Sequence, residues 1–385
     1  MTIIIPAMAH VAQSLLGTLT PSTFLRRHWQ KRPLFVRGAM PNCGAWLQPG
    51  TLFELAARDD VESRLIIRNR NRWTVKHGPI SFTRAKLRDL PERGWTLLVQ
   101  GVDQHLPDAA SLLQRFSFIP HARLDDLMVS YAPPGGGVGP HFDSYDVFLL
   151  QGAGSRHWRI SAQKNFELLE NAPLRILKSF SHTQQWIAER GDLLYLPPRY
   201  AHEGVAVDCC ITLSVGFRAP RHQELASKFL EFLQDELQLP GLYEDSDLVL
   251  QKHPAELSQA MLDKISLVLK KTHWTARDIR QFSGRYLSEP KAQTVFRPPR
   301  RPASLIAFAR RIAASGVRLA LPTRILFHGR DMFINGESHS MNTHTTHDRA
   351  ALVHLANRRA APAFTPADAT VRLLYTWYSA GYIEI

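Results

Sequence analysis

The chain has 385 residues, of which 44% are hydrophobic and 21% charged, so it can bury two or three cores and is not wholly disordered. Its formal net charge of +13 favours an anionic partner such as RNA, DNA or a ribonucleoprotein. Three cysteines without a C-x-x-C spacing make no disulfide framework, which predicts a cytoplasmic protein. The N-terminal sequence lacks the pattern of a cleaved signal peptide, and no apolar run is long enough to span a membrane.

The first 219 residues have the pattern of an all-β domain. A helix is predicted over residues 20–32, capped by Ser22 or Thr23 and ended by Pro33. Short alternating runs come next, separated by Gly and Pro, and their spacing indicates a sandwich or barrel and not βαβ units. These runs are RLIIRN, RWTVKHG, WTLLVQGV, DDLMVSYAPP, YDVFLLQG, RHWRIS, GDLLYLPP and CCITLSVGF, and both cysteines of the last one are expected in the core.

Residues 220–287 change to helical periodicity. Three helices are predicted, within residues 221–239, 254–272 and 274–288. Short helices bury little apolar surface by themselves, so this region is a candidate for packing against a second copy of the chain. The alternative is that the helices simply cover the β domain.

The C-terminal part begins with a linker at residues 288–304, which is rich in Pro and basic residues. Residues 305–385 then predict helices, a hairpin with Asn335-Gly336 as its turn, and a final strand. This content is typical of a winged-helix-like domain. The hairpin lacks the dense Lys and Arg of a DNA-binding wing, so direct nucleic-acid binding is possible but not predicted.

The stretch GGGVGPHFDSYDVFLLQGAG, residues 135–154, has two interpretations. A phosphate-binding loop would need Gly-Lys-Ser/Thr or a helix after the glycines, and neither is present. The residues after the glycines have the pattern of a strand, in which residues two apart share a face, so His141 and Asp143 are expected to point the same way. The alternative is a polar pair that only closes a turn.

A remote histidine completes a metal site. His202 is expected just after the strand and Pro-Pro corner of GDLLYLPPRYAHEG. Two histidines and one carboxylate on a β scaffold form the facial triad of Fe(II) oxygenases, which leaves positions for O2. A 2-oxo acid cosubstrate needs a cation for its far carboxylate, and Arg156 and Ser130 are the candidates on neighbouring strands.

The chain closely resembles the bacterial JmjC-type ribosomal oxygenases. Four segments carry the resemblance: HWQKRPLFVRG (28–38), DDLMVSYAPPGGGVGPHFDSYDVFLLQGAGSRHWRI (125–160), GDLLYLPPRYAHEG (191–204) and SVGFRAP (214–220). The resemblance implies a mainly β fold with helices: a JmjC/cupin double-stranded β-helix at 1–219, a helical dimerisation region at 220–287, a linker at 288–304 and a winged-helix-like domain at 305–385. A homodimer is therefore expected.

The resemblance also implies the activity. His141, Asp143 and His202 would bind Fe(II), while Arg156 and Ser130 would contact 2-oxoglutarate. With O2 as the second cosubstrate, the enzyme would decarboxylate 2-oxoglutarate and hydroxylate an arginine of a large-subunit ribosomal protein. One departure is PPRYAHEG, because cupins often have Pro-x-Gly before the histidine, whereas Arg199 and Tyr200 stand there.

A substrate arginine would need an acid near the iron. On the strand DDLMVS, Asp126, Met128 and Ser130 share a face by their period of two, so Asp126 is the candidate partner of the guanidinium. Met128 and Tyr145 are candidates to clamp the side chain, and Ser214 is a weaker one.

Two alternatives to this function remain. The same chemistry would serve another protein or RNA target, or the protein would be a non-catalytic regulator that binds nucleic acid and senses a metal or metabolite.

Overall fold

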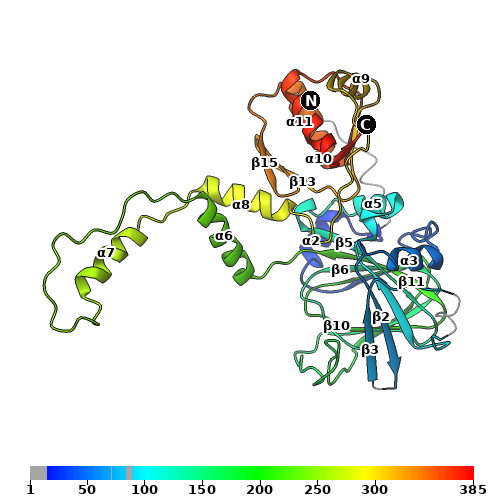
Figure 1. The fold of residues 1–385 in the computed structure, drawn as a ribbon. Helices are drawn as coiled ribbons and strands as arrows, with labels where there is room; N and C mark the ends of the chain where they lie inside the picture. The colour runs from blue at the N-terminus through cyan, green and yellow to red at the C-terminus, as the bar shows by residue number, and fades with distance from the viewer. Residues whose placement is uncertain (1–14, 71, 84–88) are drawn as a thin grey trace. The chain divides into compact units, whose positions relative to one another are not determined.

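The computed structural model describes residues 15–70, 72–83 and 89–385 (Figure 1). The N-terminal stretch, in which no signal peptide is expected, lies almost entirely outside these ranges. Contacts group the chain into two units. The first comprises Met1–Ala219, Pro290–Thr323 and Thr343–Ile385, and the second comprises Pro220–Glu289 and Arg324–Asn342. No helix in the described part of the chain is both long and apolar enough to cross a membrane.

Two antiparallel sheets form the cupin core of the first unit. The eight-stranded sheet has the order β1 (Leu34–Val36), β9 (Leu193–Leu196), β6 (Val147–Ala153), β11 (Cys210–Phe217), β5 (Leu124–Ala132), β4 (Trp95–Val99), β2 (Ser63–Asn69) and β3 (Arg72–His77). The second sheet has the order β10 (Ala201–Ala206), β7 (Arg156–Ser161) and β8 (Gln184–Ala188). The predicted fold class, a mainly β cupin core followed by helices and a winged-helix domain, is confirmed.

The period-two alternation of the central strands divides their side chains between two apolar clusters. On β6, Phe148 and Leu150 belong to the cluster that also contains helix residues, whereas Val147 and Leu149 pack with Trp158 of the second sheet. The helices of the first cluster are α2 (Pro21–Arg27), α3 (Pro49–Ala56) and α5 (Pro107–Gln114). The large sheet is therefore covered on both faces, which explains why every residue of β11 is buried.

Several local predictions for this unit are wrong. Helix α2 ends at Arg27 and is capped by Thr20, whose Oγ1 accepts a hydrogen bond from the Thr23 amide at 3.2 Å. Helices α3 and α5 and strands β8 and β10 were not predicted. Of the two cysteines expected in the core, Cys210 is buried but Cys209 is exposed. Consecutive residues at a strand end point to opposite sides, so only one of them reaches the interior.

The C-terminal part of the first unit contains three helices and a small sheet. The helices are α9 (Leu305–Ser315), α10 (Thr346–Arg358) and α11 (Asp368–Ser379), and the sheet has the order β16 (Ala360–Ala361), β12 (Val317–Leu319) and β17 (Ile383–Glu384). Gly316 ends α9 with a φ of +80°, a conformation that glycine adopts readily.

The second unit consists of α6 (His222–Glu236), α7 (Gln259–Leu269), α8 (Ala276–Ser288) and the sheet β13 (Ile325–His328), β14 (Asp331–Ile334) and β15 (Glu337–Ser340). The predicted hairpin is thus part of a three-stranded sheet, with Asn335-Gly336 joining β14 to β15. Gly284 of α8 lies against the Phe333 ring, where a Cβ would be 2.4 Å from ring atoms. The predicted domain boundaries stay a prediction, because the grouping of contacts does not follow chain order.

Candidate active site

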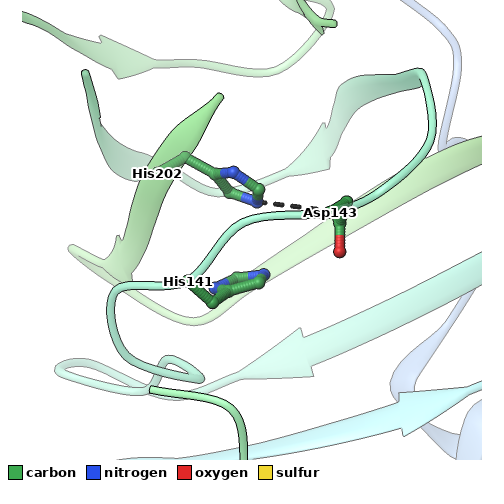
Figure 2. Close-up of side chains that lie close together, drawn as sticks. All are labelled: His141, Asp143 and His202. Carbon is green, nitrogen blue, oxygen red and sulfur yellow. Dashed lines mark ion pairs between the residues drawn. The ribbon is translucent and has the colours of Figure 1, made fainter. Parts of the chain in front are cut away.

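Three predicted metal ligands lie together in the first unit. The candidate ligand atoms of His141, Asp143 and His202 are within 4.8 Å of one another (Figure 2). The His202 Nε2 is 3.7 Å from Asp143 Oδ2, and the two imidazole centroids are 4.2 Å apart. No other group of this kind is found among the residues that the structure describes.

A short β-bridge brings the two histidines together, and this differs from the predicted geometry. Strand β6 begins only at Val147, so His141 and Asp143 do not lie in a strand, and His202 lies on β10 instead of after a strand. The His141 amide donates to the His202 carbonyl at 2.9 Å, and the His202 amide donates back at 2.8 Å. Two segments far apart in the chain are thereby joined at the site.

The hydrogen bonds of the imidazoles prepare them for a metal ion. The Nδ1 of His141 lies 2.9 Å from the Gly139 carbonyl, and the Nδ1 of His202 lies 2.9 Å from the Tyr200 carbonyl. A carbonyl only accepts, so each Nδ1 carries the proton and each Nε2 keeps its lone pair. Burial, aided by the neighbouring His141, lowers the pKa of His202 to about 4, so this imidazole is neutral near neutral pH.

Arg156 on β7 provides a buried cation beside this cluster. The side chain is 4% exposed, and its Nε and Nη2 atoms have no hydrogen-bond partner among the described residues. Its guanidinium carbon lies 5.6 Å from the centroid of the Trp158 ring. Buried guanidinium donors are costly unless an anion pairs with them, so this site fits the carboxylate of a 2-oxo acid. Ser130 on β5 is also buried and faces the same cavity.

A cavity of about 730 Å³ connects these groups. Its lining includes the three clustered residues, Arg156 and Ser130, together with the predicted substrate-contact residues Asp126, Met128, Tyr145 and Ser214. The shared face predicted for β5 is therefore present, because Asp126, Met128 and Ser130 all border the cavity. Their roles remain a prediction.

Asp126 is the buried acid of the cavity wall. Its Oδ2 accepts hydrogen bonds from the Gly101 amide at 3.1 Å and from Lys291 Nζ at 3.0 Å. Burial raises the pKa of Asp126, and the Lys291 ammonium opposes that shift. Lys291 was missed by the sequence analysis, because it lies in a basic, Pro-rich segment that has the composition of a linker.

An apolar segment of the cavity wall was also missed. The segment of chain that connects β7 to β8 contributes four apolar residues to the cavity lining: Leu168, Leu169, Leu174 and Ile176. Leu168 and Leu177 form an isolated bridge, and the Leu177 amide donates to the Pro140 carbonyl at 2.8 Å, next to His141. The leucine-rich run ELLENAPLRIL was a signal for this wall, but its length and spacing do not distinguish it from a surface loop.

The departure at PPRYAHEG is accommodated by the backbone. Arg199 has a φ of +61°, the left-handed region that glycine adopts at least cost. Its amide donates to the Asp143 carbonyl at 2.7 Å, and its guanidinium carbon lies 5.1 Å from the centroid of the Phe166 ring. The arginine therefore keeps a glycine-like turn, and His202 lies beside His141 and Asp143.

Two family models match the chain. The JmjC domain matches residues 111–225, which include His141, Asp143 and His202, and the ROXA-like winged helix matches residues 271–384.

Known proteins of the same kind are similar over most of the chain. The ribosomal protein uL16 3-hydroxylase of Escherichia coli is 35% identical over 325 residues, covering 83% of this chain and 85% of the relative. The probable ribosomal oxygenase of Haemophilus influenzae is 38% identical over 260 residues, covering 66% and 62%.

Solved structures of a ribosomal oxygenase are similar to this chain over nearly its whole length. The X-ray structure of Escherichia coli YcfD matches with a TM-score of 0.83 at 32% identity, covering 95% of this chain and 98% of that one. YcfD in complex with cobalt and 2-oxoglutarate matches with a TM-score of 0.79 at 34% identity and the same coverage. On this similarity, the chain belongs to the JmjC-domain ribosomal oxygenase family.

Proposed function

We propose that this protein is an Fe(II)- and 2-oxoglutarate-dependent oxygenase that hydroxylates an arginine side chain of a large-subunit ribosomal protein. The observation that carries the proposal is one cavity with three chemically distinct parts. The His141–Asp143–His202 cluster, the unpaired guanidinium of Arg156 and the acidic Asp126 all border it. The Escherichia coli relative is named a ribosomal protein uL16 3-hydroxylase, which supports a ribosomal substrate.

In this proposal, His141, Asp143 and His202 hold the iron. Their donor set of two imidazoles and one carboxylate fits Fe(II), and the Nδ1–carbonyl hydrogen bonds leave both Nε2 atoms as the candidate ligands. When bound, the iron supplies the oxidation chemistry that couples the decarboxylation of 2-oxoglutarate by O2 to insertion of one oxygen atom into a substrate C–H bond.

Arg156 and Ser130 bind and orient the cosubstrate. The Nε and Nη2 donors of Arg156 are the unpaired ones, and a carboxylate would satisfy both with a bidentate pair. Trp158 lies beside the guanidinium and restricts its movement. Fixing the far carboxylate in this way orients the 2-oxo group of the cosubstrate toward the iron ligands.

Asp126, Met128, Tyr145 and Ser214 bind the substrate side chain. A guanidinium is cationic and planar, so it needs a buried carboxylate at its end and apolar or aromatic contacts along its stem. Asp126 is 4% exposed, and Tyr145, which is 41% exposed, lies where the cavity meets solvent. These residues hold the target C–H bond near the iron, and the apolar wall around Leu168 excludes water.

We also propose a homodimer in the cytoplasm, where ribosomal proteins are made. The support for a dimer is the second unit, whose helices expose large apolar side chains. On α7 alone these include Leu262, Ile265, Val268 and Leu269.

The test is turnover by the purified protein with Fe(II), 2-oxoglutarate and peptides of uL16. We expect succinate release and a mass increase of one oxygen atom on an arginine, both lost in His141→Ala and Asp143→Ala. Equal turnover by the wild type and both variants would contradict an enzymatic role. In cells, the modification should be found on one ribosomal-protein arginine and disappear when the gene is deleted. Oxygen on another residue type, or on RNA, would support the alternative target instead.

A further inference from the structure

The segment after α8 lies along the first unit and is held there at several points. We name residues 290–298 the strap. Gln293 Nε2 donates to Glu62 Oε2 at 3.2 Å, Thr294 Oγ1 lies 3.3 Å from Gln104 Oε1, and the Phe296 and Tyr382 rings are 4.7 Å apart. A segment with the composition of a linker is thus anchored within the first unit, both to the β core and to the C-terminal part.

The strap places one cation behind the cavity wall. Lys291 Nζ lies 3.0 Å from Asp126 Oδ2 and 3.2 Å from Asp125 Oδ2, and its side chain is 25% exposed. Lys291 itself does not line the cavity, whereas Asp125 and Asp126 do. The ammonium group therefore contacts both carboxylates without itself lining the cavity.

The two oxygens of Asp126 have different environments. Oδ2 accepts from Lys291 and from the Gly101 amide. Within the described residues, Oδ1 accepts no hydrogen bond. It lies near Gly216, where an added Cβ would be 3.8 Å from Oδ1 and 3.9 Å from the Tyr145 ring, and both Gly216 and Tyr145 line the cavity. One oxygen is thus held by the scaffold while the other faces the cavity beside the aromatic ring.

We propose that Lys291 is a positioning residue that fixes Asp126 with Oδ1 toward the cavity and thereby sets the selectivity for a guanidinium-bearing side chain. This inference rests on the proposed function. A buried carboxylate without a partner rotates, binds water or takes up a proton, and each change weakens its pairing with a cation. Lys291 opposes all three from outside the substrate's space.

Two other roles would give different results. Lys291 would be purely structural if it only anchored the strap. It would be a competitor if its ammonium occupied the place of the substrate cation. The geometry argues against competition, because Lys291 contacts Oδ2 and leaves Oδ1 free.

The experiment compares Lys291→Met, which keeps the length of the side chain without its charge, with Lys291→Arg, which keeps the charge. The control is Arg297→Ala on the same strap, which removes an ion pair to Asp60 at 3.3 Å and leaves Lys291 intact. The full-length protein is assayed with Fe(II), 2-oxoglutarate and two uL16 peptides, one with arginine and one with neutral citrulline at the target position.

We expect Lys291→Met to raise the KM for the arginine peptide by about tenfold, the size of one charge-assisted contact. Its kcat and its KM for 2-oxoglutarate should stay close to those of the wild type, and its preference for arginine over citrulline should fall. Lys291→Arg should restore most of the preference, and Arg297→Ala should retain it.

The outcomes separate the two hypotheses. If the wild type shows no preference for the arginine peptide, the proposed substrate fails and the inference fails with it. If the wild type prefers arginine and Lys291→Met keeps that preference, only the inference fails. Equal changes of the KM and of the arginine preference in Lys291→Met and Arg297→Ala would show that Lys291 has a structural role. A lower KM for the arginine peptide in Lys291→Met would show that Lys291 competes with the substrate cation. Either result would overturn the positioning role.

Discussion

The strands of the cupin core and helix α7 are both rich in apolar residues, yet they differ in where those side chains lie. Every residue of β9 and β11 is buried. On α7, within the described structure, no side chain is buried, and Leu267 and Leu269 are 62% and 64% exposed. The same kind of residue thus builds a closed core in one region and an uncovered surface in the other.

This difference shows which apolar side chains are buried within one copy of the chain and which are not. In the core, apolar side chains pack against neighbouring strands and helices of the same unit, and the buried Asp126 is held by the Gly101 amide and by Lys291. An exposed apolar helix cannot derive its stability from burial in the same molecule, so the proposed dimer would explain its sequence. Five substitution experiments test the comparison.

The largest effect on activity is expected from substitution of the proposed metal ligands. His141→Ala and Asp143→Ala should each lower 2-oxoglutarate turnover by more than about a hundredfold, since loss of even an outer-shell partner costs tenfold to a hundredfold. Succinate release measures activity, and circular dichroism and thermal unfolding serve as controls for the fold. Turnover in either variant within a few-fold of the wild type would show that the residue is not a ligand.

The second effect is on association through α7. Leu262→Asp combined with Leu269→Asp should convert the proposed dimer to monomers, because charges in an apolar interface are costly. Ala260→Asp, at an exposed position of the same helix, is the control for added charge and should remain dimeric. Sedimentation velocity measures the outcome. If the wild-type protein is monomeric at micromolar concentrations, α7 does not form a dimer interface and the prediction is wrong.

A smaller effect is expected from filling a close contact in the core. A Cβ at Gly204 on β10 would be 2.6 Å from the Trp158 ring, whereas one at Gly50 of α3 would have nothing within 4 Å. Gly204→Ala should therefore lower the free energy of unfolding by about 1–3 kcal/mol. It should also raise the KM for 2-oxoglutarate through the Trp158–Arg156 contact.

Gly50→Ala is the matched control and should be neutral or slightly stabilising. Urea unfolding measures both variants. Equal stabilities would mean that the core around Trp158 adapts more easily than its packing indicates.

The smallest effect concerns the thiols at the edge of the buried region. Cys209 is exposed, whereas burial raises the pKa of the Cys43 thiol from 9.0 to about 11. At about pH 8, a thiol reagent should label the native protein rapidly at Cys209 and leave Cys43 unreacted. Cys209→Ser should abolish the rapid labelling, and its persistence would contradict this assignment.

The same shift of the Cys43 pKa predicts a trend in stability. Because the unfolded thiol loses its proton near pH 9 and the folded one near pH 11, the contribution of Cys43 is complete below pH 9. That contribution should be lost as the pH rises from 9 toward 11. Comparing the urea unfolding of wild type and Cys43→Ser across this range isolates it.

Much of the fold was predictable because the core strands repeat a simple alternation. The runs around Leu65, Leu97, Leu150 and Leu213 were all recognised from period two and from flanking Gly or Pro. Strand β10 was not recognised, because its sequence AHEGVA has little alternation, and it forms by pairing with β7. The prolines at 49 and 107 were usable signals for α3 and α5, since each stands at the start of its helix.

The site was predictable where residue types alone indicate chemistry. His141, Asp143 and His202 were predicted to meet in this way and do lie together, although a β-bridge joins them and not the strand that was expected. Lys291 could not be found, because a lysine near prolines is usually a solvated residue. Its contact with Asp126 joins residues that lie far apart in the chain, and no local sequence pattern predicts a contact between such distant positions.

The paired amides and carbonyls of His141 and His202 have a consequence for loading with metal. Because backbone hydrogen bonds between residues 141 and 202 hold the two imidazoles together, a metal ion would not itself have to bring these two segments into contact. Stripping by a chelator should then be reversible, with no refolding step between release and recapture. The increase in the free energy of unfolding on adding metal should then depend only on the free metal concentration relative to its Kd. A protein of this kind would respond to the metal through the fraction of sites that are occupied, without a change of fold.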